Sequence, residues 1–283
     1  AIAIILSAIV PIRSGAAEFF DTRAADRFLE IGVHGLVGTS TLLQNYQGTY
    51  PAITDLHMSA GFAGGAGASV TFGLRNFLAL GTELNFMARN SRIAMAFRGT
   101  EQMPTSAIHL SNRSYSFEVP VYISVRFNLS DDVRWNLQGG FFYSLGLSGS
   151  QRQSMFSSYI NELGQMVNIY ETAKTGYYND PEAFINSMYR SDWGLMAGTS
   201  IDVWRHVTVG FRVMFGLKNV SNDSESGTAN PRVRNLAALG TVGWRFLSLR
   251  CFDAVVMPMP RVFWDAGRIF HMILDSILRP RIA

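Results

Sequence analysis

The chain has 283 residues, of which 48% are hydrophobic and 16% are charged, with a formal net charge of +3 at neutral pH. The cations are scattered and no run of five like charges occurs, so the sequence gives little support to nucleic-acid binding. Beyond the first dozen residues no apolar run reaches 18 residues, which excludes a helical membrane protein. The single cysteine, Cys251, excludes an intramolecular disulfide, and no Cys or His spacing suggests a metal site.

The N-terminal residues are typical of a secretory signal. Residues 1–12 are apolar but too short to cross a bilayer, and residues 13–17 supply the small side chains that a signal peptidase accepts. We interpret residues 1–17 as the remnant of a signal peptide, with a buried N-terminal strand as the alternative.

Alternation of apolar and polar residues with a period of two is the main structural signal. It is clearest in residues 115–129, where every odd position is apolar or aromatic, and it recurs in 133–148 and 207–218. Weaker versions cover 28–38, 62–74, 77–89, 193–203 and 235–247. Because a strand sends successive side chains to opposite faces, and a barrel in lipid needs apolar residues outside, the pattern predicts eight membrane strands in one domain, residues 28–247.

Short and long connections alternate between these segments. Residues 74–76, 130–132 and 204–206 are tight, whereas the other connections are long: 39–61, 90–114, 149–192 and 219–234. In outer-membrane barrels short turns face the periplasm and long loops face outside. The sequence therefore predicts an all-β fold, an eight-stranded antiparallel up-and-down transmembrane β-barrel in the bacterial outer membrane, with both termini periplasmic.

A soluble eight-stranded barrel or sandwich is the alternative fold, and it would turn the apolar face inward. The aromatic residues of the apolar face favour the membrane fold. So do small residues on the polar face, which suit a narrow lumen. These are Gly65, Gly67, Gly73, Gly194, Gly198, Gly210 and Gly216.

Charged residues on the polar face form the first candidate site. Four acids and four arginines balance, and one histidine shares their face. Five are expected toward the periplasmic end: Glu30, Arg126, Arg134, Asp202 and Arg245. Four are expected nearer the middle: His34, Glu83, Glu118 and Arg212. A partly dehydrated charge is costly alone, so we expect opposite charges to pair and plug the lumen; an ion-conducting pore is the alternative.

No enzymatic activity is expected, because no histidine belongs to a recognisable nucleophile motif. A pair of His34 with Glu83 or Glu118 would be a structural hydrogen bond more often than a catalytic dyad. The segment 219–234 is rich in oxygen ligands but lacks the spacing of a calcium loop, so no metal or cofactor is expected.

The longest loop, 149–192, supplies the second candidate site. Its aromatic residues could contact glycan, lipopolysaccharide or a protein, or form a small core of the loop itself. The candidates are Phe156, Tyr159, Tyr170, Tyr177 and Tyr178. Asn179 and Asp180, followed by a proline, predict a capped short helix over residues 179–189.

The C-terminal tail, residues 250–283, is unexpected after a final barrel strand. Apolar residues recur at helical spacing, which predicts an amphipathic helix. They are Phe263, Phe270, Ile273, Leu274 and Ile277. The helix could bind a periplasmic partner, lie on the inner leaflet or cap the periplasmic mouth of the barrel.

Four runs resemble a known family: YSFEVPVYISVRF (115–127), GTELNF (81–86), GLKNVSND (216–223) and GTVGWRF (240–246). They are similar to the Bacteroidetes outer-membrane β-barrel family that includes the porin-T-like proteins. The resemblance implies a small closed barrel of OmpX type and, for some members, a component of a secretion or gliding apparatus. It implies no catalytic residues.

Three functions follow, in order of preference. The first is a structural or interaction protein that acts through its loops and tail, with outer-membrane lipid, lipopolysaccharide and a periplasmic or secretion-apparatus protein as partners. The second is a narrow porin-like channel for ions or small solutes. The third, and most distant, is a lipid-modifying outer-membrane enzyme.

Overall fold

The computed structural model describes residues 18–49, 53–99, 105–180, 183, 187–204, 206–222 and 231–249. The signal remnant predicted for residues 1–17 and the tail predicted for 250–283, with its amphipathic helix and Cys251, lie outside these residues. Within the described ranges, helix is confined to the short α2 (Tyr46–Thr49). No helix there is long and apolar enough to cross a membrane.

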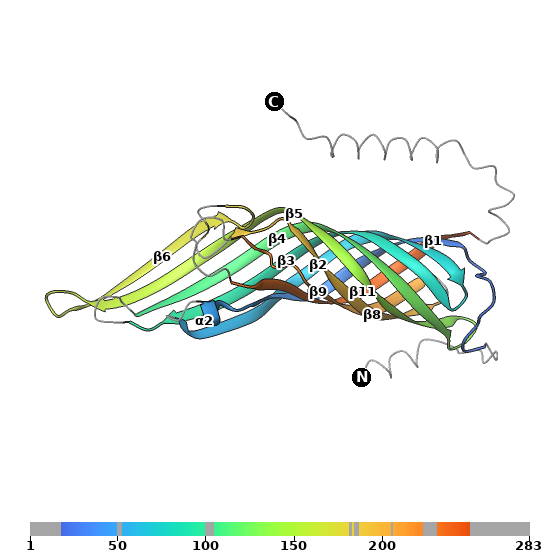
Figure 1. Ribbon diagram of the computed structural model, residues 1–283, viewed down its shortest axis with the longest axis horizontal. Helices are drawn as coiled ribbons and strands as arrows, with labels where there is room; N and C mark the ends of the chain where they lie inside the picture. Colours follow the sequence, from blue (N-terminus) through green and yellow to red (C-terminus); the bar gives the residue numbers. More distant parts are fainter. Residues whose placement is uncertain are drawn as a thin grey trace, which may run out of the picture.

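Eight long strands form a closed antiparallel ring (Figure 1). They are β1 (Leu29–Gln44), β2 (Ile53–Arg75), β3 (Leu78–Phe97), β4 (Thr105–Asn128), β5 (Val133–Ile160), β8 (Ser191–Val203), β9 (Val207–Gly216) and β11 (Val233–Leu249). The order is β4-β3-β2-β1-β11-β9-β8-β5, and β5 pairs again with β4. The all-β prediction is confirmed, and each of the eight predicted segments overlaps one of these strands, with ends that differ by no more than two residues where a segment runs past its strand. We call the end with the short connections, 76–77, 129–132 and 204–206, the turn end, and the opposite end the loop end.

The strands are longer than the sequence predicts, because much of what was expected as loop is strand. Residues 90–97, 105–114 and 149–160 extend β3, β4 and β5 beyond the ring, and β6 (Met166–Gly176) pairs with the outer part of β5. Figure 1 shows this sheet projecting from the barrel toward β6. The expectation of long loops is wrong here. A sheet in water keeps its backbone hydrogen bonds but needs no lipid-facing apolar side, so its strands lack the alternation by which strands were recognised in the sequence.

The short helix predicted for residues 179–189 is also corrected. Ser187–Met188 form the strand β7, which pairs with β10 (Ser221–Asn222), and residues 181–182 and 184–186 lie outside the described ranges. The carboxylate of Asp180 accepts a hydrogen bond from the Gly176 amide at 2.5 Å. The Asp180 carboxylate is therefore hydrogen-bonded to the end of β6.

The apolar face of the ring points outward, as predicted. Phe141 and Ile123 are 64% and 54% exposed, whereas their neighbours Phe142 and Tyr122 are 3% and 6% exposed. Outward side chains therefore form an apolar band around the ring, and the inward side chains fill its interior.

Two adjacent glycines on β5 give a test of this inside–outside assignment. A Cβ on the inward Gly140 would overlap the Val121 carbonyl oxygen and the Tyr122 Cα, whereas a Cβ on the outward Gly139 would meet nothing within 4 Å. We expect Gly140→Ala to lower the free energy of unfolding by about 1–3 kcal/mol. Gly139→Ala should raise it by up to about 1 kcal/mol, since it restricts the unfolded chain. Urea unfolding of the two variants measures both, and effects of the same sign would contradict the assignment.

The residues before β1 pack across the turn end and form hydrogen bonds there. The Phe19 ring stacks on Phe127 at 5.1 Å, and its carbonyl accepts a hydrogen bond from the Asn128 amide. Two hydrogen bonds from the Arg23 guanidinium hold the pKa of the buried Asp21 well below its usual range. This segment covers the short turns with aromatic and charged contacts.

Candidate functional site: the lumen and the loop-end sheet

The first group of interior charges lies near the turn end. Arg126 donates to Glu30 Oε2 at 2.7 Å, and Arg245 donates to Asp202 Oδ1 at 2.6 Å. Arg245 Nη1 also lies 3.6 Å from Glu30 Oε1, so the two pairs form one network. Arg134 lies beside it on β5, where its Nε donates to Asn128 Oδ1 at 3.0 Å. We call these interior pairs the turn-end network.

The second group lies closer to the middle of the barrel. Both terminal nitrogens of Arg212 donate to Glu83, at 2.6 and 3.0 Å, which is the bidentate geometry of a strong charge-assisted pair. His34 Nε2 lies 3.2 Å from Glu83 Oε2 and 2.7 Å from Asn85 Oδ1. Glu83 therefore joins Arg212, His34 and Asn85 in one network.

The third group lies toward the loop end and includes residues that the sequence analysis missed. Arg89 Nη2 lies 2.7 Å from Glu118 Oε1, and Asn235 donates to Asp192 at 2.8 Å. The sequence did not identify Arg89 or Asp192, although Arg89 is an even number of residues from Glu83 and Asp192 from Asp202. That parity puts each on the inward face. Arg89 is the last residue of the predicted segment 77–89 and could have been identified there, and Asp192 lies one residue before the predicted segment 193–203.

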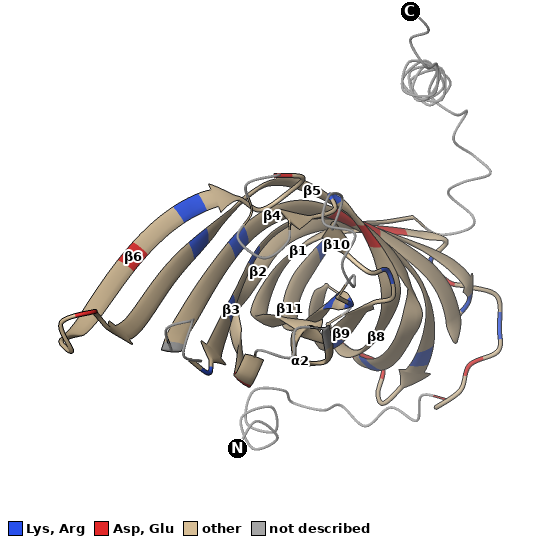
Figure 2. Cartoon of the chain, turned by 60° about the vertical axis from the view of Figure 1, so that its left-hand side comes forward, with Lys and Arg blue, Asp and Glu red and all other residues tan. Residues whose placement is uncertain are grey.

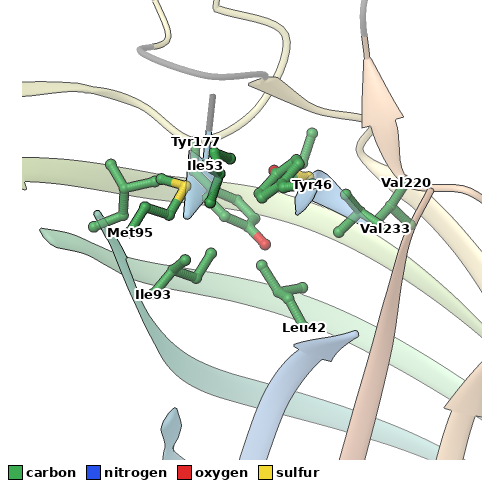
Figure 3. Packing of buried hydrophobic residues seen from close by; sticks show 10 residues of the cluster. Leu42, Tyr46, Ile53, Ile93, Met95, Tyr177, Val220 and Val233 are labelled. Carbon is green, nitrogen blue, oxygen red and sulfur yellow. The ribbon is translucent and has the colours of Figure 1, made fainter. Parts of the chain in front are cut away.

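Apolar residues fill the interior between and above the charges. Leu36, Met87, Phe142, Met196 and Met214 belong to a buried cluster inside the ring. A second cluster closes the loop end, and Figure 3 shows its side chains converging from separate strands and from α2. This loop-end cap consists of Leu42, Tyr46, Ile53, Ile93, Met95, Leu110, Tyr177, Met188, Val220 and Val233.

Two small cavities lie among the described interior residues. A cavity of about 50 Å³ is lined by His34, Glu83, Tyr122, Arg212 and Arg245, together with other polar residues. A second, of about 20 Å³, lies beside Arg89, Tyr177 and Asp192. Since one water needs roughly 10–15 Å³ of such volume, the two cavities hold only a few waters.

The structure separates the five aromatic loop candidates into two sets. Tyr177 is buried in the loop-end cap, and Tyr178 is half-buried with its ring 4.8 Å from that of Tyr177. Phe156, Tyr159 and Tyr170 are exposed on the β5–β6 hairpin. Phe156 and Tyr170 are directly paired across the two strands, so they share one face of the sheet.

In the described part of the chain, no three His, Cys, Asp or Glu side chains are grouped so that they could hold a metal ion.

A family model described as "Outer membrane protein beta-barrel domain" matches residues 17–222, which is more than half of the chain. The chain therefore belongs to this family, and the family places it in the bacterial outer membrane. No curated protein matches the chain.

The chain is also similar, at low identity, to solved structures of bacterial outer-membrane proteins. Ail, the attachment invasion locus protein of Yersinia pestis, is 10% identical in its complex with the heparin analogue sucrose octasulfate; the match covers 78% of this chain and all of that one, with a TM-score of 0.32. OprG of Pseudomonas aeruginosa is 10% identical over 80% of this chain and 99% of that one, with a TM-score of 0.25. The N-terminal barrel domain of OprF from the same organism is 10% identical over 76% and 97%, with a TM-score of 0.24.

Proposed function

We propose that the chain is a sealed outer-membrane barrel that acts as an interaction protein through the sheet at its loop end. The filled interior is the observation that carries this proposal. Three groups of buried charges at successive heights and the apolar loop-end cap occupy the interior, and the two cavities beside them hold only a few waters. The proposal includes no enzymatic role.

The projecting sheet supports the interaction role. β6 is an edge strand that is paired on one side only, with β5, and most of its residues are exposed. Such an edge offers backbone donors and acceptors to an extended segment of a partner protein. The exposed Phe156–Tyr170 pair adds an apolar contact on the same hairpin.

The orientation and the finer family assignment belong to the same proposal. The loop end faces the exterior and both termini face the periplasm, since long connections of such barrels lie outside. The Glu118-Val119-Pro120 strand supports a Bacteroidetes porin-T-like barrel, and a secretion-associated partner would then bind the loops or the tail. Residues 1–17 serve as the signal remnant and 250–283 as the periplasmic tail.

A narrow channel is the second candidate. The polar lining of the 50 Å³ cavity favours it, because Gln138, Ser200 and Thr241 accompany the charges there. Passage through the barrel would require the loop-end cap and the ion pairs to open together.

Surface labelling in intact cells tests the orientation and the exposure of the hairpin. In a Cys251→Ser background, Thr172→Cys on β6 should react with a membrane-impermeant maleimide. Asp131→Cys in a turn-end connection, the matched control, should react only after the outer membrane is permeabilised. Labelling of Asp131→Cys alone in intact cells would overturn the proposed orientation.

A further inference from the structure

Four cations gather on the outward face of the projecting sheet. Arg92 of β3, Arg113 of β4, Arg152 of β5 and Lys174 of β6 are all exposed. Figure 2 shows blue segments on β6 and on the strands beside it. We call these four residues the basic face.

The strand register places the four cations next to one another. Arg152 and Lys174 are direct cross-strand partners. Arg92 pairs with Ser111, which in turn pairs with Arg152, so Arg92 and Arg152 lie two strands apart, about 10 Å. Arg113 is two residues from Ser111 and is therefore diagonal to both arginines, about 7–8 Å from each. Like charges this close repel one another, and a bound anion would relieve the repulsion.

The described residues do not neutralise this face. None of the four cations forms an ion pair or a side-chain hydrogen bond with another described residue. Glu171 of β6 points to the opposite face. Asp55 of β2 shares the face but pairs with Ala96, roughly 13 Å along β3 from Arg92. The three guanidinium groups and the Lys174 ammonium group are therefore available to an external ligand.

The position of the basic face relative to the membrane indicates which ligand it would meet. Arg113 is two residues beyond Tyr115 on the same face of β4, about 7 Å along the strand. The Tyr115 and Phe117 rings lie 6.1 and 5.7 Å from the Phe86 ring, at the upper edge of the outward apolar band. Aromatic residues of this kind sit at the level of the lipid headgroups. Arg113 therefore meets the headgroup layer, and the other cations continue above it.

We propose that the basic face binds the phosphate groups of lipopolysaccharide in the outer leaflet that surrounds the barrel. Arginine forms bidentate charge-assisted hydrogen bonds to phosphate, and the serines at 111 and 150 between the cations can add hydroxyl donors. The inference rests on the proposed orientation, because only a loop end that faces outside meets this leaflet.

Binding of purified lipid A to the full chain in zwitterionic micelles tests the site. We expect the wild type to bind diphosphorylated lipid A. The double variant Arg113→Ser/Arg152→Ser should bind it roughly thirtyfold more weakly, which is the loss in affinity expected when two cations are removed at a membrane surface. The matched control, Arg75→Ser/Arg232→Ser, removes two exposed cations outside the basic face and should stay within about twofold of wild type. Heat-modifiable migration on gels shows that each variant is folded.

Three results would overturn the proposal: equal affinity of the two double variants, equal binding of dephosphorylated lipid A, or tighter binding of a soluble sulfated octasaccharide to the basic face than of lipid A. The last would assign the face to a soluble polyanion. Binding in micelles does not depend on orientation in the cell. Failure of this test is therefore distinguishable from failure of the labelling test with Thr172→Cys and Asp131→Cys.

Discussion

Replacing Arg212 with Met is expected to lower the free energy of unfolding by about 3–5 kcal/mol, because it leaves the Glu83 carboxylate buried without its bidentate partner. Urea unfolding in lipid vesicles, followed by tryptophan fluorescence, measures the loss. The matched control is Arg75→Met at the exposed end of β2, which should change stability by less than about 0.5 kcal/mol.

The double variant Glu83→Gln/Arg212→Met separates the charge from the packing. Removing both charges should restore at least half of the stability lost in Arg212→Met, since no uncompensated ion stays in the interior. A double variant as unstable as the single one would contradict the importance of this pair. The interior would then depend on packing around Met196 and Met214.

Replacing Tyr177 with Ala is expected to cost about 3 kcal/mol, because it opens a cavity in the loop-end cap. The matched substitution Tyr170→Ala removes the same ring from an exposed site, 71% accessible, and should cost less than about 0.5 kcal/mol. Thermal unfolding gives the two values, and limited proteolysis should show new cleavage at the loop end only in Tyr177→Ala. Similar effects of both substitutions would contradict the division of the aromatic residues into cap and surface.

The membrane-facing half of the fold was predictable because the bilayer imposes a strong contrast between the two faces of a strand. Every odd position of residues 115–129 is apolar or aromatic, and the same kind of alternation in other strands placed Glu30, Glu83 and Arg212 in the interior. The alternation does not determine which residues of neighbouring strands are paired. The sequence could therefore place Glu118 inside, but it could not pair it with Arg89.

The loop end was less predictable because its strands have no lipid face. Residues 111–114 read Ser-Asn-Arg-Ser and give no period, yet they pair in sequence with β3 and β5. Tyr177 and Tyr170 come from the same aromatic-rich segment, and only the pairing of β5 with β6 and of β7 with β10 decides which is buried. The basic face was not predictable for the same reason, since only the strand register brings its four cations together.

Single-channel conductance of the purified, heat-modifiable protein in planar bilayers tests the sealed lumen most directly. Wild type and Arg126→Ala are measured side by side, because Arg126 holds Glu30 in the turn-end network. A sealed barrel predicts that the wild type produces no steady current above background. Steady wild-type conductance that Arg126→Ala alters would contradict the sealed lumen and establish the channel in its place.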